Sequence, residues 1–129
     1  MRENDKVAAW LGVEILEVRP GYARMAMSVR EDMLNAAGVC QGGATFAFAD
    51  FAFAVAANSH GRVALAVSAQ IYYPAAARLG DRLVAEAQEV NLTEKTGLYE
   101  ITVRREGDHA LVAFFIGQVV RRPEVFPLS

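Results

Sequence analysis

The chain has 129 residues, more than half of them hydrophobic, and its 13 basic and 15 acidic side chains leave a formal charge of −2. The length predicts one domain over residues 1–129, and the high hydrophobic fraction predicts that copies of the chain bury surface against one another. The nearly balanced charge favours neither nucleic acid nor a membrane as a partner. An N-terminus without the apolar run of a signal peptide, and a single cysteine, Cys40, indicate a cytoplasmic protein without an internal disulfide.

A short helix is predicted first, over residues 5–11, with Asp5 as its N-cap and Gly12 as its end. Its apolar residues are expected to pack down as a lid, and they are Val7, Trp10 and Leu11. Two strands follow, and a tight turn at Pro20-Gly21 joins them. These strands are expected at 13–18 and 22–30, and apolar and polar residues alternate along the second.

The rest of the sequence is organised around the stretch from Leu34 to Ser59, in which Asp50 is the only charged residue. Glycines and Asn35 make its first part a loop, whereas residues 44–58 contain no glycine or proline and form a predicted helix. So apolar a helix is expected to be buried on all sides, and it is shorter than the roughly 20 residues that span a bilayer. Burying a carboxylate is costly unless it is paired, protonated or used in function, so Asp50 is a candidate functional residue.

Further strands are predicted after the helix, and their expected ranges are 63–73, 82–91, 98–105 and 110–120. The last of these strands is apolar on both faces, so it is expected in the interior of a sheet or at a contact between subunits. The tail from about residue 122 contains two prolines and is expected to be loose. His60 and His109 fall in turns and are expected to be solvated. Neither has the spacing of metal ligands around it, so no metal is predicted.

This order of elements predicts an α+β fold in which one long central helix is wrapped by a curved antiparallel sheet of five to six strands. A helix of about 15 residues is roughly 22 Å long, and strands of about ten residues run about 30 Å, so such a sheet can enclose the helix. One sheet cannot cover the helix on every side. Either the N-terminal segment or another subunit is therefore expected to cover the remaining face.

Several short motifs occur at a characteristic spacing. They are Leu34-Asn35, Gly38, Gly42-Gly43, Phe46, Ala49-Asp50, Ala52-Phe53, Ala57-Asn58, Gly80-Asp81 and the stretch from Val90 to Tyr99. With this pattern the chain resembles, over nearly its whole length, the hotdog-fold acyl-CoA thioesterases, in particular the phenylacetyl-CoA thioesterase-like branch. The resemblance implies a hotdog fold, homodimers whose sheets join edge to edge, homotetramers made from two dimers, and a role in phenylacetic acid degradation. It implies no cofactor beyond the CoA of the acyl-CoA substrate.

The resemblance also implies the chemistry of the site, which is hydrolysis of a CoA thioester. Asp50 then attacks the carbonyl or activates water, the Gly42 backbone N–H polarises the thioester oxygen, and Asn35 helps to hold the reacting groups. Gln41 stands where the family usually has a histidine, and its amide can orient a carbonyl or a water but cannot take up a proton. The family's common Arg-Pro pair is replaced by Tyr73-Pro74, so we expect this loop and its substrate contacts to differ.

The residues themselves are compatible with this chemistry. The junction at Gln41-Gly42-Gly43 offers free N–H groups and the positive end of a helix dipole, where a developing oxyanion is stabilised. Asp50 lies eight residues after Gly42, roughly 12 Å along a helix, so the two groups can act on one carbonyl only if Asp50 comes from a partner subunit. The candidate substrate-binding residues are Gly43, Thr45, Tyr73, Lys95 and Thr96.

Structural explanations stay open for these residues. Asp50 could be a buried carboxylate hydrogen-bonded at a subunit contact, the glycines could only turn the chain, and Asn35 could be an ordinary turn residue. Cys40 has no obvious activating partner and is expected to be buried and apolar in role. Two other functions compete with hydrolysis. One is a hotdog protein that binds acyl-CoA without cleaving it, which Gln41 favours, and the other is a dehydratase, which would need a histidine that the helix lacks.

Overall fold

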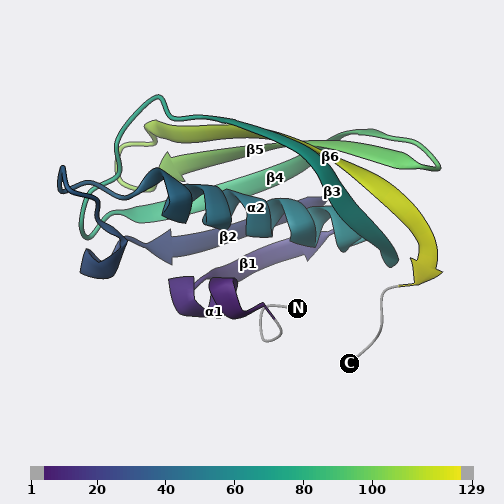
Figure 1. Cartoon of the computed structure of the whole chain (residues 1–129), viewed down its shortest axis with the longest axis horizontal. Coiled ribbons are helices and arrows are strands. Elements are labelled where there is room, and N and C mark those ends of the chain that lie inside the picture. The colour runs from purple at the N-terminus through teal and green to yellow at the C-terminus, as the bar shows by residue number, and fades with distance from the viewer. Residues whose placement is uncertain (1–4, 126–129) are drawn as a thin grey trace.

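The structure, a computed structural model, describes residues 5–125 as one curved antiparallel sheet with one long helix lying against it (Figure 1). The helices of this region are α1 (Lys6–Leu11), the short 3-10 helix η2 (Glu31–Met33) and α2 (Gly42–Asn58). Its strands are β1 (Glu14–Arg19), β2 (Tyr22–Ser28), β3 (Arg62–Tyr72), β4 (Arg82–Leu92), β5 (Thr96–Arg105) and β6 (Leu111–Val125). This architecture confirms the expected α+β fold with its central helix.

The strands are ordered β1-β2-β4-β5-β6-β3, and every neighbouring pair is antiparallel. β6 lies between β5 and β3, which confirms that its apolar sequence belongs in the interior of the sheet. β3 is an edge strand. It pairs with β6 from Arg62 opposite Val125 to Tyr72 opposite Phe114, and no strand of residues 5–125 pairs with its other side.

The core lies between α2 and the sheet, and large aromatic side chains fill it. Phe48 and Phe53 of the helix, Tyr99 of β5 and Phe115 of β6 are almost completely buried. The ring of Phe53 lies 5.4 Å from that of Phe115 and 5.8 Å from that of Tyr99, both in tilted geometry. Gly117 of β6 leaves the space for this packing, because a Cβ there would lie 2.6 Å from Phe53 Cζ. These contacts fix the helix against the sheet and so fix the positions of both of its ends.

α1 forms as predicted, but only part of it packs down. The Asp5 side chain accepts a hydrogen bond from Ala8 N at 3.0 Å, and Gly12 ends the helix with a left-handed φ of 71°. Ala8 and Leu11 are buried, which agrees with one inward face at a spacing of three residues. Trp10, however, is 54% exposed, and Val7 is similarly exposed, so the expected lid contact is wrong for these two residues.

Several boundaries differ from the prediction, and those of α2 and β6 bear on the site and on the tail. α2 begins at Gly42 rather than Ala44, because glycine is tolerated in a first turn whose N–H groups have no partners within the helix. β6 continues to Val125, so the loose tail does not begin at residue 122. Pairing with β3 outweighs the effect of Pro123 here. The remainder of the expected tail, residues 126–129, lies outside the described residues.

Candidate active site

The N-terminus of α2 presents two backbone amides without hydrogen-bond partners. Gln41 is the N-cap in an extended conformation, its side chain makes no cap hydrogen bond, and its own N–H donates to Met33 O at 2.8 Å. Ala44 N donates back to Gln41 O at 3.0 Å. Within residues 5–125 the N–H groups of Gly42 and Gly43 have no acceptor. They lie at the positive end of the helix dipole, where an anion or a developing oxyanion is stabilised.

Asn35 shapes the loop that precedes the helix. Its Oδ1 accepts hydrogen bonds from Ala37 N at 2.9 Å and from Val39 N at 3.3 Å, and its backbone N–H donates to Val39 O at 2.8 Å. A bridge between Leu34 and Cys40 closes the loop. The oxygen of Asn35 is therefore engaged in the turn, as the structural explanation expected, whereas its Nδ2 has no partner in the described part of the chain.

A cavity of about 390 Å³ opens beside this helix start. Three of the predicted site residues line it together, namely Gly42, Thr45 and Tyr73. The other walls are largely apolar and consist of Val39, Cys40, Val112 and residues 74–77. Thr45 is only 2% exposed, and its Oγ1 lies 3.6 Å from the sulfur of Cys40. Burial raises the pKa of the Cys40 thiol, which is therefore protonated and not a nucleophile at neutral pH.

Tyr73 contacts the helix start directly. Its hydroxyl donates a hydrogen bond to Gly42 O at 2.9 Å, and its ring lies over the Gly42 α-carbon. A Cβ on Gly42 would lie 3.2 Å from Tyr73 Cζ, so the absence of a side chain at residue 42 is part of this contact.

Asp50 lies on a face of α2 that the chain leaves partly open. Four residues define this face, because their spacing of four, three and four residues places them on one side of a helix and none of them is fully buried. They are Gly43, Ala47, Asp50 and Ala54. One chain therefore leaves a face of the helix partly open, as expected for a single sheet, and burial of the helix on all sides stays a prediction that requires another subunit. Asp50 does not line the cavity at the helix start.

The Asp50 carboxylate is half-buried without a neutralising partner in residues 5–125. It has no hydrogen bond or ion pair with any other residue in the described range. Burial, and to a lesser extent the negative charge of Asp5, raise the pKa of Asp50 above 3.8. A half-buried carboxylate with a raised pKa and no partner is suited to accept a proton.

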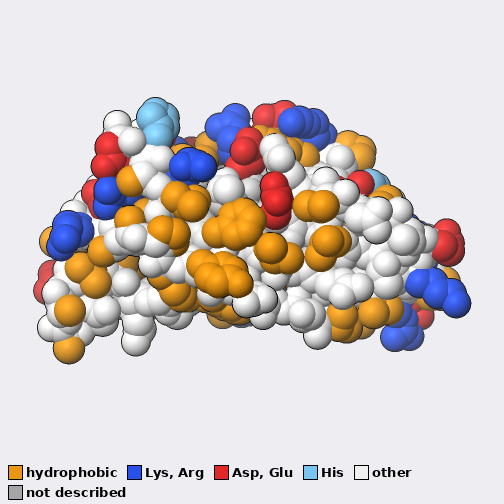
Figure 2. Space-filling model, turned by 90° about the horizontal axis from the view of Figure 1, so that it is seen from above, with side chains coloured by type: hydrophobic (Ala, Val, Ile, Leu, Met, Phe, Trp, Pro, Cys, Tyr) orange, Lys and Arg blue, Asp and Glu red, His pale blue; other side chains and the backbone are white. Residues whose placement is uncertain are grey.

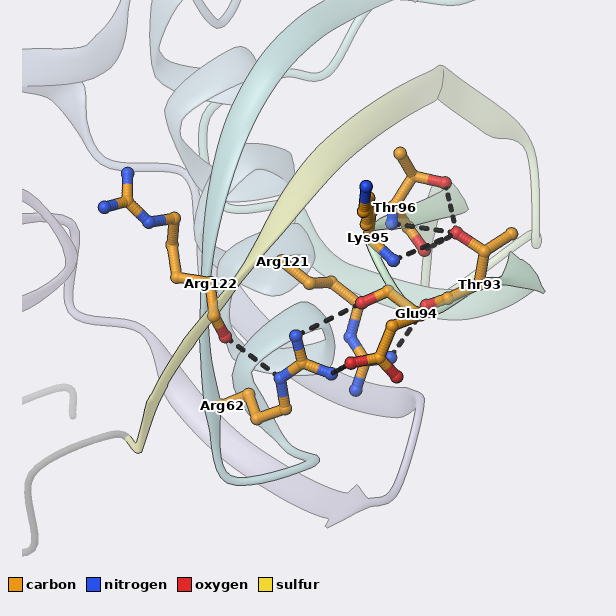
Figure 3. A network of polar contacts seen from close by, with 7 residues as sticks. All are labelled: Arg62, Thr93, Glu94, Lys95, Thr96, Arg121 and Arg122. Atoms are coloured by element: carbon orange, nitrogen blue, oxygen red, sulfur yellow. Dashed lines mark hydrogen bonds and ion pairs between the residues drawn. The ribbon is translucent and has the colours of Figure 1, made fainter.

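Lys95 and Thr96 lie at the other end of the molecule, in the turn between β4 and β5 (Figures 1 and 3). Thr93 Oγ1 accepts from Thr96 N at 2.9 Å and from Lys95 N at 3.3 Å, which closes the turn. Arg62, at the start of β3, donates to the carbonyl of Glu94 at 3.1 Å and to its carboxylate at 3.2 Å. One chain therefore does not bring Lys95 and Thr96 together with Gly42.

His60 has a role that sequence analysis missed. Its Nε2 lies 2.6 Å from Glu89 Oε1, and its side chain is only 20% exposed, so the expectation of a solvated histidine is wrong. Tyr99 Oη donates to the same carboxylate oxygen at 2.9 Å. No local sequence signal could have revealed this cluster, because its members come from α2's end, β4 and β5.

Comparison with known proteins identifies the family. Residues 37–112, more than half of the chain, match the family described as the thioesterase superfamily. A protein of Archaeoglobus fulgidus is 48% identical over 127 residues, which cover 98% of this chain and 82% of the relative. The Escherichia coli acyl-coenzyme A thioesterase PaaI is 38% identical over 118 residues, which cover 92% of this chain and 84% of the relative. The structure of the E. coli PaaI protein from the phenylacetic acid degradation operon matches with a TM-score of 0.95 at 36% identity, covering 98% of this chain and 91% of that one.

The chain therefore belongs to the thioesterase superfamily, a class of hydrolases that act on thioester bonds. The match to PaaI confirms the hotdog fold and the resemblance to the PaaI-like branch. Among residues 5–125, no helix is long and apolar enough to cross a membrane, and no group of three or more His, Cys, Asp or Glu side chains could hold a metal ion.

Proposed function

We propose that this protein is an acyl-CoA thioesterase that hydrolyses the CoA thioester of a small acyl group, including aromatic groups of the phenylacetyl type. The observation that carries the proposal is the pair of unpartnered amides, Gly42 and Gly43, beside a largely apolar cavity of about 390 Å³. The relative named PaaI is an acyl-coenzyme A thioesterase, and the solved PaaI structure comes from a phenylacetic acid degradation operon. Both support an acyl-CoA substrate, and the apolar walls support a compact hydrophobic acyl group.

The site we propose is shared by two subunits that pair through the β3 edge. Residues 65–70 of this strand are all exposed, and Leu65 and Val67 are at least half exposed. Figure 2 shows hydrophobic side chains gathered across the face seen from above, over the β3 side of the sheet. An exposed apolar edge strand is a liability unless another strand pairs with it. Antiparallel pairing of two β3 strands gives a homodimer, and two such dimers give the proposed homotetramer.

This pairing explains the distribution of the predicted site residues. α2 packs beside the sheet, so a two-fold axis through β3 sets the two helices antiparallel and brings Asp50 of the partner subunit toward Gly42. The same axis places the start of one β3 beside the end of the other. Because Arg62 at that start holds the β4–β5 turn, Lys95 and Thr96 of the partner subunit come to the side of the cavity, where they can bind the CoA phosphates.

In the proposed reaction the acyl carbonyl lies against Gly42, and its oxygen accepts a hydrogen bond from the Gly42 N–H. The Asp50 carboxylate either removes a proton from a water that attacks the carbonyl carbon or attacks that carbon itself. The C–S bond then breaks, CoA leaves as its thiol, and the net reaction consumes one water and yields a carboxylic acid. Gln41 is exposed beside the amides, where its side-chain amide orients the water. The Nδ2 group of Asn35 makes no hydrogen bond within residues 5–125, so it is available to hold the reacting groups.

Free-thiol release from a panel of acyl-CoA esters, including phenylacetyl-CoA and benzoyl-CoA, tests the proposal against the alternative of a non-catalytic acyl-CoA-binding protein. Catalysis predicts turnover of at least one ester, with a preference for small hydrophobic acyl groups. Calorimetric binding of the same esters without thiol release would contradict hydrolysis and favour the binding protein.

Subunit mixing tests whether the site is shared. Gly42→Pro removes the proposed donor N–H at the first helical position, where proline is tolerated, and Asp50→Asn removes the proposed base. Each variant alone is expected to be inactive. A heterodimer of the two contains one site with both functional groups, so refolding them together should restore activity. No restoration in a verified heterodimer would contradict a site shared between subunits.

A further inference from the structure

The contact between Tyr73 and Gly42 joins the end of the edge strand to the start of the helix. The Gly42 carbonyl, which accepts the Tyr73 hydroxyl at 2.9 Å, belongs to the same planar peptide unit as the Gly43 N–H. The ring of Tyr73 lies against the Gly42 α-carbon, and that carbon links this peptide unit to the one that carries the Gly42 N–H. One side chain thus binds the peptide unit that carries the Gly43 N–H and lies beside the α-carbon that joins it to the Gly42 N–H, and both N–H groups lack partners in residues 5–125.

Tyr73 is itself held in place by the backbone on both sides. The residue before it, Tyr72, is paired in the sheet with Phe114 of β6. The residue after it is Pro74, which restricts the preceding residue to extended conformations. The phenol therefore projects from an anchored position, and its hydrogen bond transmits the position of β3 to the helix start.

The chemistry of the phenol fits a permanent donor. Tyr73 is 48% exposed, and the partial burial of its hydroxyl raises the pKa of that group above 10.0, so it stays protonated at neutral pH. A donor on the carbonyl side of a peptide also polarises the N–H on its other side, because hydrogen bonds in a chain strengthen one another.

We propose that Tyr73 is a positioning residue for thioester hydrolysis, which holds the Gly42–Gly43 peptide so that the amides at the start of α2 point at the thioester oxygen. This inference rests on the proposed function. Tyr73 acts through Gly42 rather than by contact with the reacting atoms. The Cβ of a side chain at residue 42 would lie about 3.2 Å from the ring, so the ring would have to shift by a few tenths of an ångström.

Kinetics of Tyr73→Phe, which keeps the ring and removes the hydroxyl, test the proposal. The expected result is a kcat lower by about ten-fold with a nearly unchanged KM, because the loss affects alignment in the transition state rather than substrate binding. Tyr72→Phe is the matched control, because the Tyr72 hydroxyl accepts a hydrogen bond from Gln70 and none from the helix start, so its loss should leave both constants unchanged. A Tyr73→Phe variant with the kcat of the wild-type protein would overturn the proposal.

A double-mutant cycle sharpens the test. Gly42→Ala keeps the N–H but displaces the ring, so it should lower kcat in the wild-type protein and have little further effect in Tyr73→Ala. Equal losses in both backgrounds would contradict a role for Tyr73 through Gly42.

A measurement without substrate separates this inference from the proposed function. Backbone 15N relaxation should show Gly42 and Gly43 more mobile in Tyr73→Phe than in wild type and unchanged in Tyr72→Phe. Equal mobility in all three proteins would overturn the positioning role even in an active thioesterase. Conversely, a wild-type protein that cleaves no ester contradicts the proposed function, while increased mobility of the two amides would still support their positioning by Tyr73.

Discussion

The two ends of α2 differ in how their polar groups are satisfied. At the N-terminal end the Gly42 and Gly43 amides have no partners in the described residues, the cap residue Gln41 leaves its side chain in solvent, and a cavity lies alongside. Nothing within residues 5–125 gives these two amides an acceptor. A helix terminus left in this condition is ready to bind a ligand.

At the C-terminal end the polar side chains of Asn58 and Ser59 are both engaged in hydrogen bonds. Asn58 donates to Ala54 O at 2.8 Å and accepts from Ala64 N at 2.9 Å, which ties the helix end to β3. Ser59 Oγ donates to the carbonyl of Ala56 at 2.6 Å and accepts from Gly21 N at 2.8 Å, which ties it to the β1–β2 turn. The Glu89 cluster with His60 and Tyr99 lies beside these contacts.

The two ends of α2 thus separate polar groups that are satisfied within the fold from polar groups that remain available to bind a ligand. Hydrogen bonds that are complete within one chain stabilise the fold, and removing one partner leaves a buried group unsatisfied. Groups that remain unsatisfied, such as the Gly42 amide and the Asp50 carboxylate, lower stability unless a substrate or another subunit engages them. Substitutions at the two ends should therefore affect different measurements.

The largest effect is expected for Asp50→Asn, which should lower kcat by about a thousand-fold, because the variant cannot accept a proton or attack the carbonyl. The same substitution should raise the free energy of unfolding at pH 7. The pKa of Asp50 is raised in the folded chain, so its contribution to stability is complete below 3.8 and is lost as the pH rises through the folded value. Thiol release and urea unfolding measure the two effects.

Acidic conditions provide a control for this prediction. The difference in stability between wild type and Asp50→Asn should vanish near pH 3, because the carboxyl group is then neutral in both the folded and the unfolded chain. The kcat of the wild type should fall as the pH drops through a value above 3.8. If Asp50→Asn instead destabilises the protein at pH 7, Asp50 is a structural carboxylate.

At the other end, Glu89→Ala should lower the free energy of unfolding by about 2–3 kcal/mol, since it leaves the buried Tyr99 hydroxyl and His60 without their acceptor. The comparison variant is Glu94→Ala, whose carboxylate is 84% exposed and pairs with Arg62, and its cost should be below about 1 kcal/mol. Urea unfolding of both proteins provides the measurement. Equal costs would mean that the cluster is not a stabilising feature.

Local signals made much of the fold predictable. Three of these signals depend on neighbouring residues and are confirmed, namely the cap at Asp5, the left-handed glycine after α1 and the turn at Pro20-Gly21. The expected alternation is confirmed along most of β4 and β5 but not along β2, where Tyr22 and Ala26 are also buried. β6 ended later than expected because pairing with β3 overrides the local effect of Pro123. Boundaries decided by such long-range pairing are not encoded in the local pattern.

The candidate site was predictable only in part. Glycines before an apolar helix indicated the open helix start, and a lone charge within that helix drew attention to Asp50. Two contacts join residues about 30 positions apart, so spacing in the sequence could not reveal them. They are the hydrogen bond from Tyr73 to Gly42 and the contact between the side chains of His60 and Glu89. Uniform hydrophobicity along α2 did not show which face the sheet leaves open, because Ala47 and Ala54 of that face look like core residues in sequence.

The smallest pH-dependent effect is expected for Tyr99→Phe, and this effect appears only in alkaline solution. Burial, followed by the hydrogen bond to Glu89, raises the pKa of Tyr99 above 10.0. The contribution of Tyr99 to stability is therefore complete below pH 10 and is lost above it, where the unfolded chain ionises while the folded chain keeps its proton. Urea unfolding between about pH 9 and 11 should show the wild type losing stability more steeply than Tyr99→Phe, by up to about 1.4 kcal/mol per pH unit. Parallel pH dependence of the two proteins would mean that the Tyr99 hydroxyl ionises as readily in the folded chain as in the unfolded one. That result would contradict the burial of this hydroxyl and its hydrogen bond to Glu89 beside the C-terminal end of α2.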